Sequence, residues 1–293
     1  YGGKLLVRKT ALGVLASAGV LALAACSATR VAYDNADTVI RFMASSYLDL
    51  DSAQSEDLGP RIARFHQWHR VNELPAYAAL LQSASQRAAN GITAEDVSWG
   101  LDNLRARYRG LAAKAAEDAA PVLATLRPAQ LAVLERKFAE SNEKYAKEFL
   151  PADEKKRLRA QGKRMLERLR DFAGELTPEQ EARIGGFVAA HERHAALRFE
   201  DRQRLQRELV ALLEQRREPQ ELGRQLAEMF TRPEARRSEE FLREDRRWDG
   251  DFAQLIADLD RSLSPAQRAR VVRRLSGYAE DCAVLAGKKT EAA

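Results

Sequence analysis

The sequence predicts an all-α protein, built as an elongated antiparallel bundle of long helical hairpins. Apolar residues recur at spacings of three and four through most of the chain after residue 30, and no segment alternates with a period of two. Glycine and proline, which interrupt helices, number only 16 and 9 among 293 residues. Helix starts also carry a repeated local pattern, which is typical of helical proteins.

The apolar spacing places helices along the whole chain from residue 31. The clearest stripe consists of Val97, Leu101, Leu104, Tyr108 and Leu111. A helix over 178–217 would be about 60 Å long at 1.5 Å per residue, longer than a compact domain is wide. We expect either one extended domain over 31–286 or two lobes that divide near 120–127 or 174–177, before a disordered tail at 287–293. The predicted helices span 31–50, 56–71, 74–90, 94–118, 128–150, 152–174, 178–217, 219–230, 234–261 and 265–286.

Three helix starts repeat the pattern Leu-x-Pro-x-Gln. They are Leu126 to Gln130, Leu176 to Gln180 and Leu263 to Gln267. Thr177 or Ser264 can cap the first backbone amides, and the proline that follows has the φ of a first helical residue. The glutamine three residues after the cap can close a capping box. Capping chemistry alone is therefore sufficient to produce the pattern.

The N-terminal segment has the composition of a bacterial export signal. Lys4, Arg8 and Lys9 precede an uncharged, mostly apolar run over 10–25. A membrane-spanning helix needs about 20 apolar residues, and this run has roughly 16. The pattern predicts that residues 1–25 are a signal peptide that is removed.

Leu23, Ala24 and Ala25 precede Cys26, and this sequence resembles the lipobox of bacterial lipoproteins. The resemblance implies that Cys26 becomes the first mature residue and carries diacylglycerol and an N-acyl chain, with 26–30 as a short tether. One acyl chain binds a membrane only marginally, whereas three should hold essentially permanently. Ser27, in place of aspartate, resembles the outer-membrane class of sorting signal. We therefore expect a lipid anchor in the outer membrane, facing the periplasm.

The charge distribution argues against nucleic-acid binding. Removal of the signal takes away three cations and lowers the net charge from +5 to +2. The arginine-rich stretch from Glu192 to Asp249 contains 14 basic and 14 acidic residues. Mixed charges at this spacing are typical of solvated helix faces rather than of a phosphate-binding stripe. The predicted partners are the membrane and an envelope protein or unfolded client.

The four histidines form two pairs, His66 with His69 and His191 with His194. Residues three apart share a helix face, so each pair is able to bind one metal ion, and two pairs together would suit Zn or Cu. Apolar neighbours favour the alternative, in which the rings are packed and hydrogen-bonded. The spacing also differs from the H-E-x-x-H of zinc proteases, and no catalytic triad is present, so no enzyme and no cofactor is predicted.

Two resemblances bear on function. The first is carried by Tyr33, by Leu48, Asp49 and Leu50 with Gln54, and by a box of seven residues. This set resembles a family of proteobacterial lipoproteins of unknown function, which implies no activity. The box residues are Trp68, His69, Arg70, Glu73, Leu74, Pro75 and Tyr77.

The second resemblance is that of the three Leu-x-Pro-x-Gln copies to the LTXXQ signature of small periplasmic stress chaperones. Those proteins are helical cradles for unfolded clients, and they carry two copies in about half this length. The resemblance implies binding, scaffolding or chaperone-like work in the cell envelope. The alternative is a periplasmic metal-binding protein that uses the two histidine pairs.

Overall fold

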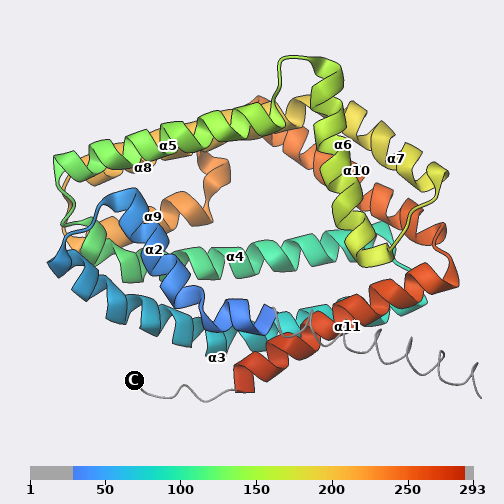
Figure 1. The fold of residues 1–293 in the computed structure, drawn as a ribbon, viewed down its shortest axis with the longest axis horizontal. Coiled ribbons are helices and arrows are strands. Elements are labelled where there is room, and N and C mark those ends of the chain that lie inside the picture. The colour runs from blue at the N-terminus through green and yellow to red at the C-terminus, as the bar shows by residue number, and fades with distance from the viewer. Residues whose placement is uncertain (1–28, 288–293) are drawn as a thin grey trace, which may run out of the picture.

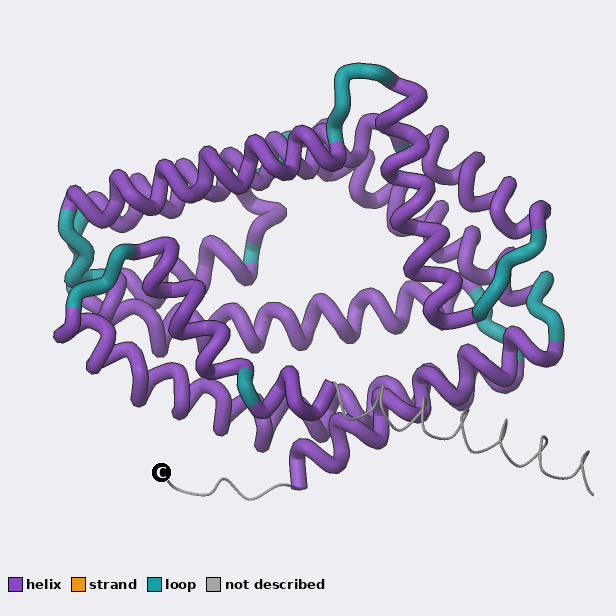
Figure 2. The backbone as a smooth tube through the Cα atoms, viewed as in Figure 1, coloured by secondary structure: helices purple, strands orange, loops and turns teal. Residues whose placement is uncertain are grey.

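The computed structural model describes residues 29–287, which form helices joined by short loops (Figure 1). Figure 2 shows no strand in this part of the chain, so the predicted all-α class is confirmed. The predicted signal peptide, Cys26 and residues 288–293 of the predicted tail lie outside the described residues. None of the described helices is both long enough and apolar enough to cross a membrane.

The described chain begins with a helical segment at 29–34. The three predicted Leu-x-Pro-x-Gln starts are confirmed, because helices begin at Pro128, Pro178 and Pro265. The elements are α2 (Ala36–Leu48), α3 (Ser52–Asn90), α4 (Ala94–Leu123), α5 (Pro128–Phe149), α6 (Glu154–Ala173), α7 (Pro178–Ala190), α8 (Glu192–Glu214), α9 (Pro219–Thr231), the 3-10 helix η1 (Pro233–Arg236), α10 (Glu239–Arg261) and α11 (Pro265–Gly287).

The predicted helix boundaries are wrong in four places, and the two smaller errors are the turn at Asn35 within 31–50 and the division of 234–261 into η1 and α10. The larger errors concern α3 and the helix 178–217.

Helices 56–71 and 74–90 are one continuous helix, α3, which contains Pro60 and Pro75. Proline removes one backbone hydrogen bond from a helix. Val71, four residues before Pro75, is exposed, so its carbonyl loses a helix partner where water is close.

The other larger error is the single helix 178–217. It is divided at His191 into α7 and α8, with φ −117° and ψ 27° at that residue. Both ring nitrogens of His191 contact carboxylates of α10, those of Glu244 and Asp251. These contacts fix the side chain at the bend, and they depend on residues more than fifty positions away.

The N-terminal half (29–174) and the C-terminal half (175–287) are interleaved, because helices of one half pack against helices of the other. Helix α11 packs along α3, α5 along α8, and α4 along both α9 and α10. Figure 1 shows these pairs on the sides of an elongated frame, with α6, α7 and α10 together at one end. The main packing partner of each long helix therefore belongs to the other half.

The helix-start pattern occurs a fourth time, without its proline, at Leu50 to Gln54. Asp51 is the N-cap of α3 and forms a capping box with Gln54. Each half of the chain thus has two such boxes, at the starts of α3 and α5 and at the starts of α7 and α11. The structure brings the two boxes of each half into contact.

In the N-terminal half, the contact is a pair of reciprocal side-chain amides, the Gln54–Gln130 clasp. Each Oε1 accepts from the backbone N–H of its own N-cap, Asp51 at 3.1 Å and Arg127 at 3.0 Å. Gln130 Nε2 also donates to Gln54 Oε1 at 2.7 Å and to the Asp49 carbonyl at 2.8 Å. One buried side chain therefore caps its own helix and ties it to the start of another.

The C-terminal half repeats these bonds in a Gln180–Gln267 clasp. The two Oε1 atoms accept from the Thr177 and Ser264 N–H groups, both at 2.9 Å. Gln267 Nε2 donates to Gln180 Oε1 at 3.1 Å and to the Glu175 carbonyl at 2.7 Å. The same local device thus occurs once in each half.

The largest apolar cluster lies where α9 packs on α4. Leu222, Leu226 and Met229 are almost fully buried there. Gly223 lets the two helices approach closely, because a Cβ at this position would lie 3.3 Å from Ala120 Cβ. A second cluster joins α7 to α10 at the other end of the molecule. The first cluster holds α9 against one side of α4, and it borders the apolar pockets along α4 that form the candidate site.

Candidate functional site: apolar pockets along helix α4

The apolar stripe predicted on α4 is only partly covered by other helices. Leu104 is 51% and Tyr108 is 52% exposed. The two side chains are four residues apart, so they share one face of the helix. Thr93 and Asp96 form a capping box that fixes the start of α4. The stripe therefore presents large apolar side chains to solvent from a well-defined helix.

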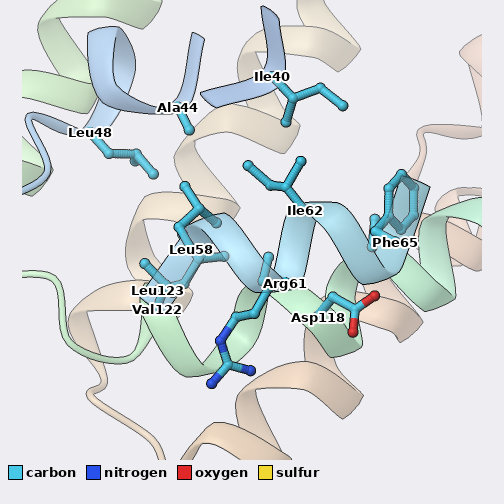
Figure 3. Close-up of a pocket in the computed structure, with 12 residues that line it drawn as sticks. Ile40, Ala44, Leu48, Leu58, Arg61, Ile62, Phe65, Asp118, Val122 and Leu123 are labelled. Atoms are coloured by element: carbon cyan, nitrogen blue, oxygen red, sulfur yellow. The ribbon is translucent and has the colours of Figure 1, made fainter. Parts of the chain in front are cut away.

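A first apolar pocket of about 200 Å³ lies between α2, α3 and α4. Figure 3 shows side chains of α2, including Ile40 and Leu48, facing Leu58 and Ile62 of α3 across it. Arg61 and Asp118 are its only charged lining residues. The complete lining is Ile40, Ala44, Leu48, Leu58, Arg61, Ile62, Phe65, Ala115, Asp118, Ala119, Val122 and Leu123.

Asp118 adds one polar feature to this pocket. Its Oδ1 lies 3.2 Å from Lys114 Nζ, whereas its Oδ2 is buried and has no hydrogen-bond partner among the described residues. Burying an acceptor without a donor costs free energy.

Two further apolar pockets continue along α4. One, of about 390 Å³, lies beside the first and shares Phe65 and Leu123 with it, and α9 supplies Leu226 and Phe230. The other, of about 280 Å³, lies near the start of α4 and includes Trp99 and Leu104. Their walls are almost entirely apolar side chains. The three pockets along α4 therefore form a surface that is suited to binding apolar groups.

The first histidine pair packs against the N-terminal helical segment. His69 Nδ1 lies 2.9 Å from the Tyr33 hydroxyl, and the ring of His66 is 4.6 Å from the Tyr33 ring. Burial raises the pKa of Tyr33 to about 12. Burial also lowers the pKa of His66 and of His69 below the usual histidine value. These two histidines are therefore neutral packing partners at neutral pH.

The second pair is buried against α10. The His191 ring nitrogens lie 3.0 Å from Glu244 and 3.0 Å from Asp251, and His194 Nε2 lies 3.2 Å from Asp245. The hydrogen bond to His194 is the main cause that lowers the pKa of Asp245. The two pairs thus contact different elements. Within residues 29–287 there is no group of three or more His, Cys, Asp or Glu side chains that could hold a metal ion.

The box of seven residues joins three segments of the chain. Arg70, which is buried, donates to Asp34 at 3.5 Å and lies over the Tyr33 ring. Glu73, also buried, is 3.7 Å from Arg107 of α4. Trp68 and Tyr77 add ring contacts with Phe65 and His69, Leu74 is buried, and Pro75 lies inside α3. The box therefore holds the N-terminal segment and α4 against α3.

Sequence reasoning identified the stripe on α4 but missed the opposite wall of the first pocket. Ile40, Ala44 and Leu48 come from α2 at spacings of four, a pattern that is visible in the sequence. Ala115 and Ala119 of α4 leave the space, because their side chains are small. The absence of a hydrogen-bond partner for Asp118 Oδ2 among the described residues has no sequence signal, since it depends on what the fold places near that atom.

Comparison with known proteins gives one family. None of the curated proteins and none of the solved structures matches the chain. The sequence pattern of the Family of unknown function (DUF6279) matches residues 46–243, a stretch that includes α3, all of α4 and the α9 wall of the pockets. The expected membership of a family of unknown function is thereby confirmed. Since the match covers well over half of the sequence, the protein belongs to the DUF6279 family.

Proposed function

We propose that this protein is an outer-membrane lipoprotein on the periplasmic side that binds apolar segments of other envelope proteins in a chaperone-like way, without catalysis. The observation that carries the proposal is the uncovered stripe of α4 with apolar pockets along it. Lipidation of Cys26 and the outer-membrane location rest on the N-terminal sequence, which lies outside the described residues.

The exposed apolar stripe of α4 costs free energy as long as it stays in contact with water. Apolar surface in water costs about 25 cal/mol per Å², and soluble proteins rarely keep contiguous apolar patches that bind nothing. Leu104 and Tyr108 line pockets of about 280 Å³ and 390 Å³, which have room for apolar side chains of another protein. A client segment with exposed apolar side chains would bury them in these pockets and cover the stripe at the same time.

The two glutamine clasps support a preformed binding surface. They fix the starts of α3, α5, α7 and α11 by side-chain hydrogen bonds, which are buried in the Gln54–Gln130 clasp and partly buried in the Gln180–Gln267 clasp. A surface that is ordered before binding loses less conformational entropy when a client binds.

The proposal is tested by the aggregation of several unfolded client proteins, followed by light scattering. We expect the protein to suppress aggregation at near-stoichiometric ratios. Leu104→Asp combined with Tyr108→Asp should abolish most of this effect, because two carboxylates would have to be desolvated by the client. Val71→Asp is the matched control, since Val71 is 57% exposed and lines none of the three pockets.

Circular dichroism of all variants would show that the helices are retained. The proposal is refuted if the unsubstituted protein leaves the aggregation of every client unchanged. It is equally refuted if Val71→Asp weakens the suppression as much as the α4 substitutions do. The anchor is tested separately by the intact mass of protein from native membranes, which should lack residues 1–25 and include three acyl chains.

A further inference from the structure

A second apolar surface lies near the N-terminus, on the far side of α2 from the first pocket. Val31, Val39, Phe42 and Met43 form this surface, which we call the α2 outer face. All four are more than half exposed, and Phe42 reaches 74%. Phe42 and Met43 follow Val39 by three and four residues on one face of α2, and Val31 is exposed on the segment 29–34 that precedes the turn at Asn35.

The charged residues of this segment bond to neighbouring helices, although Asp34 and Arg41 stay exposed, and Arg30 pairs with Asp281 of α11. Asp34 pairs with Arg70 of α3, and Arg41 donates to the Gly59 carbonyl of the same helix. Asp37 acts electrostatically on His66 of α3. The other exposed positions of the segment, such as Asn35, Thr38 and Ser46, are uncharged. The helix α2 thus has apolar side chains both toward α3 and toward solvent, whereas an ordinary surface helix turns a polar face to water.

The position of the segment in the chain indicates what covers the α2 outer face. Residue 29 follows Cys26 by three positions. Three residues span at most about 11 Å even when they are fully extended. If Cys26 carries acyl chains in the membrane, the start of this segment is held within about that distance of the bilayer.

We infer that the α2 outer face lies in the interface of the lipid bilayer, with α2 running along the membrane surface. The inference rests on the lipid anchor of the proposed function. An interfacial helix buries its apolar side about 5–10 Å into the headgroup region, and phenylalanine suits that depth. Because the outer face has no cation, its attraction to the membrane is hydrophobic and does not depend on anionic lipids or on low salt.

The test uses the processed, acylated protein in vesicles of zwitterionic lipid. A fluorophore is attached at Phe42→Cys, or at Gln254→Cys as the control, each combined with Cys282→Ser. Gln254 is exposed on α10, which makes no close packing with α2. We expect quenching by aqueous iodide to be at least about fivefold weaker at residue 42 than at residue 254, because the interface excludes the anion. A lipid-borne quencher should show the opposite order.

The outcomes separate the inference from the anchor. Acylated Cys26 with equal iodide quenching at both positions overturns the inference alone. Protection from iodide without quenching by the lipid-borne probe also overturns it, since a protein would then cover the face. If the intact mass shows an unmodified Cys26, the lipid anchor is wrong. Co-sedimentation of that protein with the same vesicles then tests whether the α2 outer face binds the membrane by itself. The inference is supported if the unsubstituted protein binds the vesicles and the double variant Phe42→Ser with Met43→Ser does not. It is overturned if the unsubstituted protein does not bind.

Discussion

Replacing Gln130 with alanine removes the centre of the Gln54–Gln130 clasp. Gln130 is only 2% exposed, and the substitution deletes its bonds to the Arg127 N–H, the Asp49 carbonyl and Gln54. Each such bond contributes about 0.5–1.5 kcal/mol net, so we expect a loss of about 2–4 kcal/mol. With an m-value of about 3 kcal/mol/M, that loss lowers the urea midpoint by about 1 M.

The assay is urea unfolding followed by far-ultraviolet circular dichroism. Gln254→Ala is the matched control, because Gln254 is exposed and bonds only to Asp258 of its own helix, so its effect should stay within about 0.5 kcal/mol. Gln130→Glu keeps the acceptor that caps α5 but cannot donate to the Asp49 carbonyl, so it should destabilise nearly as much as alanine. A midpoint for Gln130→Ala equal to that of Gln254→Ala would refute the reasoning.

Three further predictions follow from single contacts. Gly223→Val should lower the free energy of unfolding by about 1–3 kcal/mol through overpacking against α4, whereas Gly250→Val, with nothing within 4 Å, should cost clearly less; urea midpoints would show the difference. The pKa of Asp245 is lowered in the folded state, so its contribution to stability is present above the ordinary value of 3.8 and is lost as pH falls through the folded pKa. The stability difference between the unsubstituted protein and Asp245→Asn should therefore be constant at neutral pH and shrink at acid pH, as measured by unfolding at each pH. Burial raises the pKa of Tyr33 to about 12, so ultraviolet absorbance during alkaline titration should show late phenol ionisation, and Tyr33→Phe should reduce that late change.

Local chemistry explains which parts of the fold the sequence predicts. The starts at Pro178 and Pro265 are set within five residues by a side-chain cap, a proline and a glutamine, and the start at Pro128 by the proline and the glutamine, so they are visible in the sequence. The start of α3 uses the same bonds, but Ser52 stands where the other copies have proline, and the pattern is easily missed. The pairing of glutamines from different helices depends on tertiary contacts and has no signal within any one box.

The candidate site was predictable to a smaller extent. The stripe that includes Leu104 and Tyr108 is evident from its spacing, but periodicity does not tell whether another helix covers it. For the histidines, the sequence left metal binding and packing open. The carboxylates that bond to His191 and His194 come from α10, more than fifty residues later, and no spacing rule connects them. The break between α7 and α8 was missed for the same reason.

The packing of helices from one half of the chain against helices of the other half affects how the chain folds. Ser85 of α3 donates to the carbonyl of Val272 of α11, a contact that spans 187 residues. Most all-α proteins fold fast because their contacts are local, whereas distant contacts require long loops to close first. Here α3 acquires its main partner only when the last helix has been synthesised. Refolding should accordingly be slow for a helical protein, and neither half on its own retains the partners of its long helices.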